Sequence, residues 1–169
     1  MDTARPLHDE VLSEPGQIIV DNTRSRILVA DTRHHRIVIT DLEGTVTHVI
    51  GTGNEGLVDS VCEESQFRHP QGIAADANFI YVADTGNHII RRVDRRAHRV
   101  TTIAGSGKPG CDDGAAPEAA FEEPVSLALA NALLYVVDAR RPMIRVLDLT
   151  GLTVSTLALK PAQPAAEGR

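Results

Sequence analysis

The stretch ILVADTRHHRIVI, residues 27–39, decides the fold, because it recurs twice further along the chain. It returns as IYVADTGNHIIRR at residues 80–92 and as LYVVDARRPMIRV at residues 134–146. Asp31, Asp84 and Asp138 hold the same place in the three copies. Such a period of about 50 residues is typical of a repeat architecture, in which each copy is one structural unit.

The segments between these copies repeat as well. GTGNEGLVDSVCEESQFRHP, which begins at Gly51, aligns without a gap on GSGKPGCDDGAAPEAAFEEP, which begins at Gly105. Asp59 and Asp113 are among the identical positions. With the three aspartates, the shared residues form a structural signature of the repeat: Gly51, Gly105, Phe67, Phe121, Pro70 and Pro124.

Each copy contains short apolar runs rich in β-branched residues and separated by turn formers, a pattern that predicts strands. Four strands in each copy predict one β-propeller blade for each copy. The fold class is therefore all-β, a propeller of four-stranded antiparallel blades, with three blades in this chain as a partial ring or half of a six-bladed ring. The expected strands are 17–21, 26–30, 36–40 and 45–50 in the first copy, 72–75, 79–83, 89–94 and 99–104 in the second, and 126–130, 133–137, 143–148 and 153–158 in the third.

This pattern divides the chain into an N-terminal segment at 1–12, three blades within 13–159 and a disordered Pro- and Ala-rich tail at 160–169. The blades are expected at about 13–51, 68–105 and 122–159, with long linkers at 52–67 and 106–121. A structureless loop of that length is uncommon in a compact domain, so we expect a short helical turn around Val61–Gln66.

The signature P-Q-G-I from Pro70, followed by I-Y-V-A-D-T-G-N-H-I-I-R and then by T-I-A-G, resembles the NHL repeat over residues 13–159. The glycine-bearing linkers are similar to the NHL region of proteins in which a thioredoxin-like domain precedes a propeller, and we expect no such domain here. The resemblance implies a ring of about six blades. Three blades would leave two apolar faces open, so either copies associate as a homo-oligomer that closes the ring, or the chain is a fragment of a longer propeller.

Composition limits which classes of partner and which cellular locations we expect. The formal net charge is -6, which disfavours nucleic acid as the main partner. No apolar run approaches the length of a membrane span, and the start of the chain lacks the pattern of a signal peptide. Cys62 and Cys111 suggest neither a disulfide framework nor a zinc site. We therefore expect a cytoplasmic protein that does not bind membranes.

The repeated aspartates invite a reading as metal ligands or general bases. A structural role is favoured, because an Asp after an apolar strand forms a turn by bonding its own backbone. His34, His35 and His88 follow them, and some NHL propellers are zinc-dependent lyases that take a histidine from each of several blades. The third copy has Pro142 instead, so we expect no metal, no cofactor and no catalytic residue.

Binding residues are expected where arginines gather. Arg33, His34, Arg140 and Arg141 lie near the loops between the second and third strands, on a face shared with the acidic linkers. A second cluster, in the hairpin that ends blade two, is the better candidate for an anionic partner: Arg91, Arg92, Arg95, Arg96 and Arg99. Alternation along a strand would also place such arginines in solvent.

The function predicted from these observations is a non-catalytic scaffold for protein–protein interaction. One alternative is a propeller enzyme of the metal-dependent lyase or lactonase type, with its site at the ring axis. The other is RNA binding through the basic hairpin.

Overall fold

The computed structural model describes residues 11–161, which form three antiparallel sheets. The first contains β1 (Pro15–Asp21), β2 (Arg26–Asp31), β3 (Arg36–Asp41) and β4 (Val46–Ile50). The second contains β5 (Pro70–Ala75), β6 (Phe79–Asp84), β7 (Ile89–Asp94) and β8 (Arg99–Ala104). The third contains β10 (Pro124–Ala130), β11 (Leu133–Asp138), β12 (Met143–Asp148), β13 (Thr153–Leu157) and the short β9 (Gly114–Ala115). The predicted all-β blades are confirmed.

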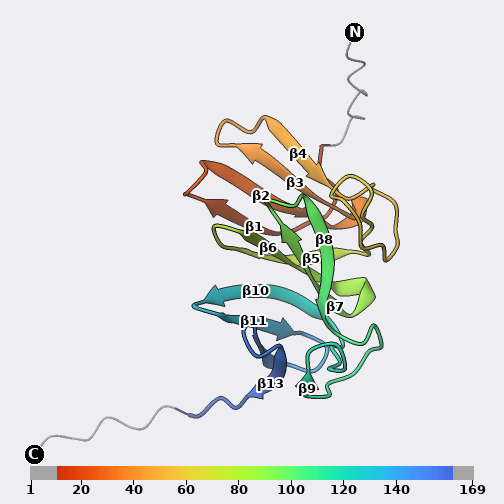
Figure 1. The fold of residues 1–169 in the computed structure, drawn as a ribbon, viewed down its shortest axis with the longest axis vertical. Coiled ribbons are helices and arrows are strands. Elements are labelled where there is room, and N and C mark those ends of the chain that lie inside the picture. The colour runs from red at the N-terminus through yellow and green to blue at the C-terminus, as the bar shows by residue number, and fades with distance from the viewer. Residues whose placement is uncertain (1–10, 162–169) are drawn as a thin grey trace, which may run out of the picture.

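Consecutive strands pair in the order β1-β2-β3-β4, and the second sheet repeats this order. Figure 1 shows the three sheets following one another along the molecule, from the red and orange sheet to the blue one. We call the contact between the first two sheets the first junction, and the contact between the last two the second junction. The predicted N-terminal segment and tail fall mainly on residues 1–10 and 162–169, which lie outside the described residues.

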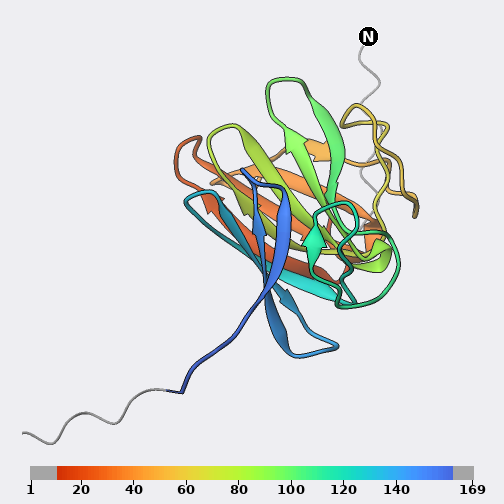
Figure 2. The same cartoon turned by 60° about the horizontal axis from the view of Figure 1, so that its bottom comes forward.

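The two linkers are not free loops, because each one covers the outer edge of the blade that follows it. In the first linker, Ser60 O accepts a hydrogen bond from Val100 N of β8 at 2.8 Å. In the second, β9 pairs with β13 and adds a fifth strand to the third sheet, which the sequence pattern did not predict. Figure 2 shows both linkers at the same side of the molecule. Pairing an outer strand satisfies backbone groups that would otherwise be open at a sheet edge.

The helical turn expected at Val61–Gln66 is a single hydrogen-bonded turn. Ser65 N donates to Val61 O at 3.0 Å, and Ala119 N donates to Ala115 O at 2.9 Å at the same place in the second linker. No helix longer than the three-residue turns η1 (Thr32–His34) and η2 (Thr85–Asn87) occurs in residues 11–161. Consequently no helix in that range is long and apolar enough to cross a membrane.

The core consists of two clusters, one at each junction. At the first junction, Leu28, Ile37 and Ile39 of the first blade face Ile80 and Val93 of the second. At the second junction, small and branched residues again dominate, around Phe121 of the second linker. The chain has no Trp and only three Phe, so closely stacked aliphatic sheet faces supply most of the buried apolar area.

The inner strands of all three blades are joined by one side chain, Gln17 of β1. Its Nε2 donates to Leu127 O at 3.0 Å, and its Oε1 accepts from Leu127 N at 3.1 Å. The same oxygen accepts from Ile73 N at 3.2 Å. The blades therefore converge along β1, β5 and β10, as expected for strands nearest a propeller axis.

Candidate functional site

The three repeated aspartates are fully buried, and they bind the chain where it enters the blade. Asp31 Oδ1 accepts from Ser13 N at 2.7 Å, and Asp84 Oδ1 accepts from Arg68 N at 2.7 Å. Asp138 accepts from the amides of Glu122 and Glu123. These aspartates were predicted to bond the backbone of their own turn. That prediction was wrong, because the amides that they bind lie more than ten residues earlier in the chain.

The predicted turn chemistry belongs to a different set of aspartates, those that end the third strand of each blade. Asp94 Oδ1 accepts from the amides of Arg96 and Ala97, and Asp148 Oδ1 accepts from Thr150 and Gly151. These hydrogen bonds lower the pKa of both carboxyls, since they stabilise the ionised form. Asp41, at the equivalent position of the first blade, accepts from Thr45 N, four residues later in the chain.

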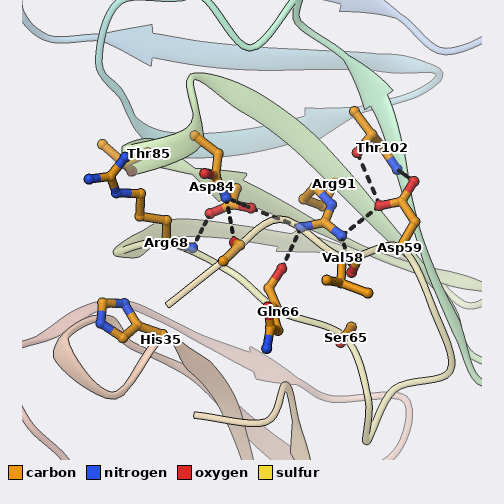
Figure 3. Close-up of polar contacts among 12 residues, drawn as sticks. His35, Val58, Asp59, Ser65, Gln66, Arg68, Asp84, Thr85, Arg91 and Thr102 are labelled. Atoms are coloured by element: carbon orange, nitrogen blue, oxygen red, sulfur yellow. Dashed lines mark hydrogen bonds and ion pairs between the residues drawn. The ribbon is translucent and has the colours of Figure 1, made fainter. Parts of the chain in front are cut away.

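Arg91 of β7 is the centre of a buried polar network, drawn in Figure 3. Its Nη1 donates to Asp84 Oδ2 at 2.9 Å and to Gln66 O at 2.9 Å. Its Nη2 donates to Asp59 Oδ1 at 2.6 Å and to Val58 O at 2.9 Å. Neither Arg91 nor Asp84 has exposed side-chain surface, so the predicted binding role of Arg91 is wrong.

The network connects three parts of the molecule. Asp59, in the first linker, also accepts from Thr102 N of the outer strand at 2.8 Å, and Figure 3 places it between Arg91 and Thr102. Burial raises the pKa of Asp84, and hydrogen bonds from Asn87, Arg68 and Arg91 oppose that shift. One guanidinium thus holds a linker, an outer strand and a buried carboxylate together.

The third blade repeats this arrangement with Arg145. Its Nη2 donates to Asp113 Oδ1 at 2.7 Å, and Asp113 Oδ2 accepts from Thr156 N at 3.0 Å. The guanidinium lies 5.3 Å from the ring centre of Phe121, as that of Arg91 lies 5.0 Å from Phe67. These contacts explain why the aspartate and phenylalanine recur in both linkers.

The first blade has Val38 at the position of Arg91 and Arg145, as the strand registers show. Asp31 binds Arg36 instead, with its Oδ2 at 2.7 Å from Arg36 Nε. Sequence reasoning missed the buried arginines, although the shared register of Arg91 and Arg145 with two recurring linker aspartates was a usable signal.

Other signature residues join one blade to the next. Thr32 Oγ1 donates to Pro70 O at 2.8 Å, and Thr85 Oγ1 donates to Pro124 O at 2.6 Å. The third blade has Ala139 at this position and lacks the hydroxyl.

Gly51 and Gly105 leave the outer strands at a φ of 103°, which favours glycine. A Cβ on Gly105 would lie 2.7 Å from His88 O, and one on Gly51 would lie 3.0 Å from the Phe67 ring. Both the backbone conformation and the space available therefore require glycine at this turn.

His35 and His88 hold equivalent left-handed positions with opposite hydrogen-bond roles. His35 Nδ1 accepts from His69 N at 3.1 Å, whereas His88 Nδ1 lies 2.7 Å from Glu122 O and must donate to it. Burial lowers the pKa of His35, and the neighbouring His69 lowers it further. A neutral imidazole is the form that can accept the amide hydrogen bond.

Residues 67–92, which hold Phe67, Asp84 and Arg91, match the family model of the NHL repeat. NHL repeat-containing protein 2 of Bos taurus is 45% identical to this chain over 113 residues. The chain belongs to the NHL-repeat family. The buried Arg91 network and the Thr85 bond to the next blade are thus contacts within and between NHL repeats.

The bovine match covers 66% of this chain and 15% of that protein, so the chain spans about 15% of the length of this relative. Protein SUPPRESSOR OF QUENCHING 1, chloroplastic, of Arabidopsis thaliana is 43% identical over 104 residues, or 60% of this chain and 10% of that protein. A structural genomics protein of unknown function from Bacteroides thetaiotaomicron superposes with a TM-score of 0.69 at 20% identity, covering 81% of this chain and 33% of the other. That likeness shows the fold alone.

The arginines predicted to bind near the loops between the second and third strands mostly pair with nearby acids. Arg33 binds Glu14, and His34 binds Asp31. Arg140 and Arg141 both bind Glu122. The three arginines in these pairs are exposed, and exposed ion pairs contribute little to stability. Their role in binding a partner stays a prediction.

The basic hairpin of the second NHL repeat is divided by the fold. Arg92 lies over the Phe79 ring, and Arg95 is nearly buried against Asp21, 2.6 Å from its Oδ2. Only Arg96 and Arg99 of the predicted cluster are exposed. The five arginines therefore do not form one basic surface, because alternate strand positions face different blades.

One group of side chains has the composition of a metal site, with ligand atoms of His35, Glu55 and His69 within 4.8 Å of one another. Two of these three groups already have partners. His35 Nδ1 accepts the His69 amide, and Glu55 lies 2.7 Å from Arg68 Nε. These contacts compete with an ion, and the expectation that the chain holds no metal stays a prediction.

Proposed function

We propose that this chain is a non-catalytic scaffold that binds proteins through the open faces of its NHL blades. The observation that carries the proposal is the exposure of residues whose repeat equivalents are buried. Val137 of β11 is 41% exposed, whereas Ala30 and Ala83 at the same register are fully buried. Leu157 is 39% exposed, whereas Ile50 and Ala104 are buried.

The other end of the chain presents the opposite kind of face. Ile18 of β1 is 61% exposed, while Ile73 and Leu127 at the same register are 0% and 3% exposed. Val20, on the same side of the strand, is 54% exposed. Contiguous apolar faces of this kind mark interaction sites in soluble proteins.

The partner that best fits the third blade is another blade. Its open face encloses a hollow of about 470 Å³ lined by Val137, Met143, Ile144 and Leu157 among other residues. In blades one and two, this side of the sheet packs against the next blade. The first blade's open face is the matching surface, so the proposal includes a homo-oligomer in which copies associate head to tail.

The first and third blades also differ from the second in the groups that bind neighbouring segments. Val38 stands where Arg91 binds a linker, and Ala139 lacks the hydroxyl by which Thr85 binds Pro124.

A cytoplasmic location belongs to the same proposal, supported by the free thiols of Cys62 and Cys111. Expression of the chain as a fluorescent fusion, followed by microscopy and cell fractionation, tests it. Fluorescence inside a membrane-bound organelle would reject a cytoplasmic location.

Light scattering coupled to size-exclusion chromatography tests the open-face scaffold. The molar mass measured in solution is expected to exceed the 18.2 kDa of one chain, and Val137→Asp is expected to reduce it to that of a monomer. Leu42→Asp is the control, because Leu42 is 53% exposed in a hairpin and lies away from the open face. A wild-type monomer, or equal effects of the two variants, would reject association through this face.

A further inference from the structure

The first junction contains a cavity whose lining side chains differ in chemistry from those at the second junction. It has a volume of about 90 Å³ and lies between the outer parts of blades one and two. A single water needs about 10–15 Å³ on this scale, so the space accommodates a group of several heavy atoms. The cavity is therefore large enough for a short side chain or a small organic molecule.

The lining combines apolar and charged side chains. Ile39, Ile80 and Val93, which belong to the core cluster of the first junction, supply much of the apolar part. The charged and polar part comprises three arginines, two histidines and two acids: Arg24, Arg26, Arg95, His48, His98, Glu63 and Asp94. Small-molecule sites usually pair apolar walls with a few convergent polar groups.

Arg95 supplies the observation that points to a ligand. Its side chain is 9% exposed, and its Nη1 binds Asp21 Oδ2 at 2.6 Å. Its Nε and Nη2 are buried and have no hydrogen-bond partner among the described residues. Unpaired buried donors are costly, and an oxygen acceptor in the cavity would relieve that cost.

The second junction shows that the fold alone does not require this chemistry. The strand registers place Phe79 where the first junction has Arg26. Leu149 and Leu152 take the places of Arg95 and His98 in the next hairpin. Phe79, Leu149 and Leu152 line the equivalent hollow together with polar residues that include Asp76, and Arg92 lies over Phe79 at 4.8 Å. Arg26, Arg95 and His98 at the first junction thus occupy positions that are apolar at the second.

We propose that the cavity at the first junction binds a carboxylate carried on a short branched aliphatic group. The carboxylate oxygens accept from Arg95 and from Arg26, and the aliphatic group packs on Ile39, Ile80 and Val93. Charge-assisted hydrogen bonds of this type orient the ligand, while burial of its aliphatic part provides the apolar contribution. A free short-chain acid and the carboxyl terminus of a peptide that ends in leucine share this chemistry.

The test is a titration of the full chain with isovalerate, followed by amide chemical shifts in two-dimensional NMR. Shifts are expected at residues around the cavity, and isoamyl alcohol, which has the same branched chain without the carboxylate, is expected to bind about tenfold more weakly. Equal binding of the acid and the alcohol, or shifts spread over the molecule, would overturn the proposal.

Variants assign the binding to the named residues. Arg95→Met and Arg26→Glu are each expected to weaken isovalerate binding about tenfold or more, since each removes a charge-assisted hydrogen bond. Arg96→Met, on the same hairpin and exposed, is the matched control and should not change affinity. If Arg95→Met fails to fold because Asp21 loses its partner, Arg26→Glu still decides, and unchanged binding by that variant rejects the site.

A peptide with a carboxyl-terminal leucine, compared with its amidated form, distinguishes a peptide ligand from a free short-chain acid. Tighter binding of the free-acid peptide than of isovalerate assigns the site to a protein partner. Tighter binding of isovalerate assigns it to a small metabolite, and binding of neither acid overturns the proposal. The result does not depend on association through the open blade faces, so either proposal can fail alone.

Discussion

Arg91 Nη1 lies 2.9 Å from Asp84 Oδ2, and both side chains are completely buried. The same guanidinium also holds Asp59 of the first linker. A buried ion pair is weak evidence of net stabilisation, but removing one partner leaves the other charge without compensation. The pair therefore sets how strongly the linker is held to the second blade.

Replacement of Arg91 by Met is expected to lower the free energy of unfolding by about 3–5 kcal/mol, because Asp84 would remain buried and unpaired. Urea denaturation followed by circular dichroism measures this loss. Arg91→Met with Asp84→Asn should recover part of it, which gives the coupling energy of the pair. Arg96→Met, exposed on the same hairpin, should stay within about 0.5 kcal/mol of wild type, and a similar loss there would contradict the interpretation.

His35 predicts a pH dependence at the first junction. Its pKa is lowered in the folded state, mainly by burial, so the unfolded chain binds the proton more readily. The contribution of His35 to stability is therefore complete above a pH of about 6.5 and decreases as the pH falls toward its folded pKa. Thermal melts across this range should show a smaller pH dependence in His35→Gln than in wild type.

His88 is the control for that experiment, because it occupies the same backbone conformation but faces a carbonyl acceptor. Its Nδ1 donates to Glu122 O and accepts no amide hydrogen bond, so His88→Gln should retain the wild-type pH dependence. An equal reduction of the pH dependence in both variants would reject the role assigned to His35.

Gly105 and Gly44 separate backbone strain from lack of space. Both have positive φ, at 103° and 91°, but a Cβ on Gly105 would lie 2.7 Å from His88 O, whereas a Cβ on Gly44 has nothing within 4 Å. Gly44→Ala should cost about 1–2 kcal/mol from the backbone conformation. Gly105→Ala should cost about 1–3 kcal/mol more, from overpacking. Equal losses in chemical denaturation would show that space is not limiting there.

Thr85 predicts a measurable bond between blades two and three. Thr85→Val should lower stability by about 1–3 kcal/mol, because the Pro124 carbonyl loses its donor in a buried place. The reverse change, Ala139→Thr, adds the hydroxyl where the described residues provide no proline carbonyl, and it should be nearly neutral. Guanidinium denaturation compares the two, and a neutral Thr85→Val would reject the inter-blade contribution.

Much of the blade could be read from the sequence. The short apolar runs of IYVADTGNHIIRR, separated by turn formers, predicted β6 and β7 closely, and the gap-free match between the linkers identified Gly51 and Gly105 as fixed turns. These features depend on neighbouring residues and on the backbone, which is why pattern reasoning finds them.

The candidate site was less accessible to pattern reasoning. Arg91 and Arg95 belong to the same arginine-rich segment, yet one is enclosed by a linker and the other lines a cavity beside Asp21. Strand alternation shows which residues share a face, but it does not show what covers that face. The partners of Arg91 in the first linker are 25–33 residues earlier in the chain.

The sequence by itself determined the repeat, the four strands of each blade and the glycine turns, since each follows from local conformation and a recurring pattern. Only the tertiary structure decided that the repeated aspartates bind incoming amides, that Arg91 is buried and that Arg95 has free donors at a cavity. Those properties depend on which segments meet across a junction. A buried arginine needs hydrogen-bond partners, and the segments around it supply them for Arg91 but only in part for Arg95.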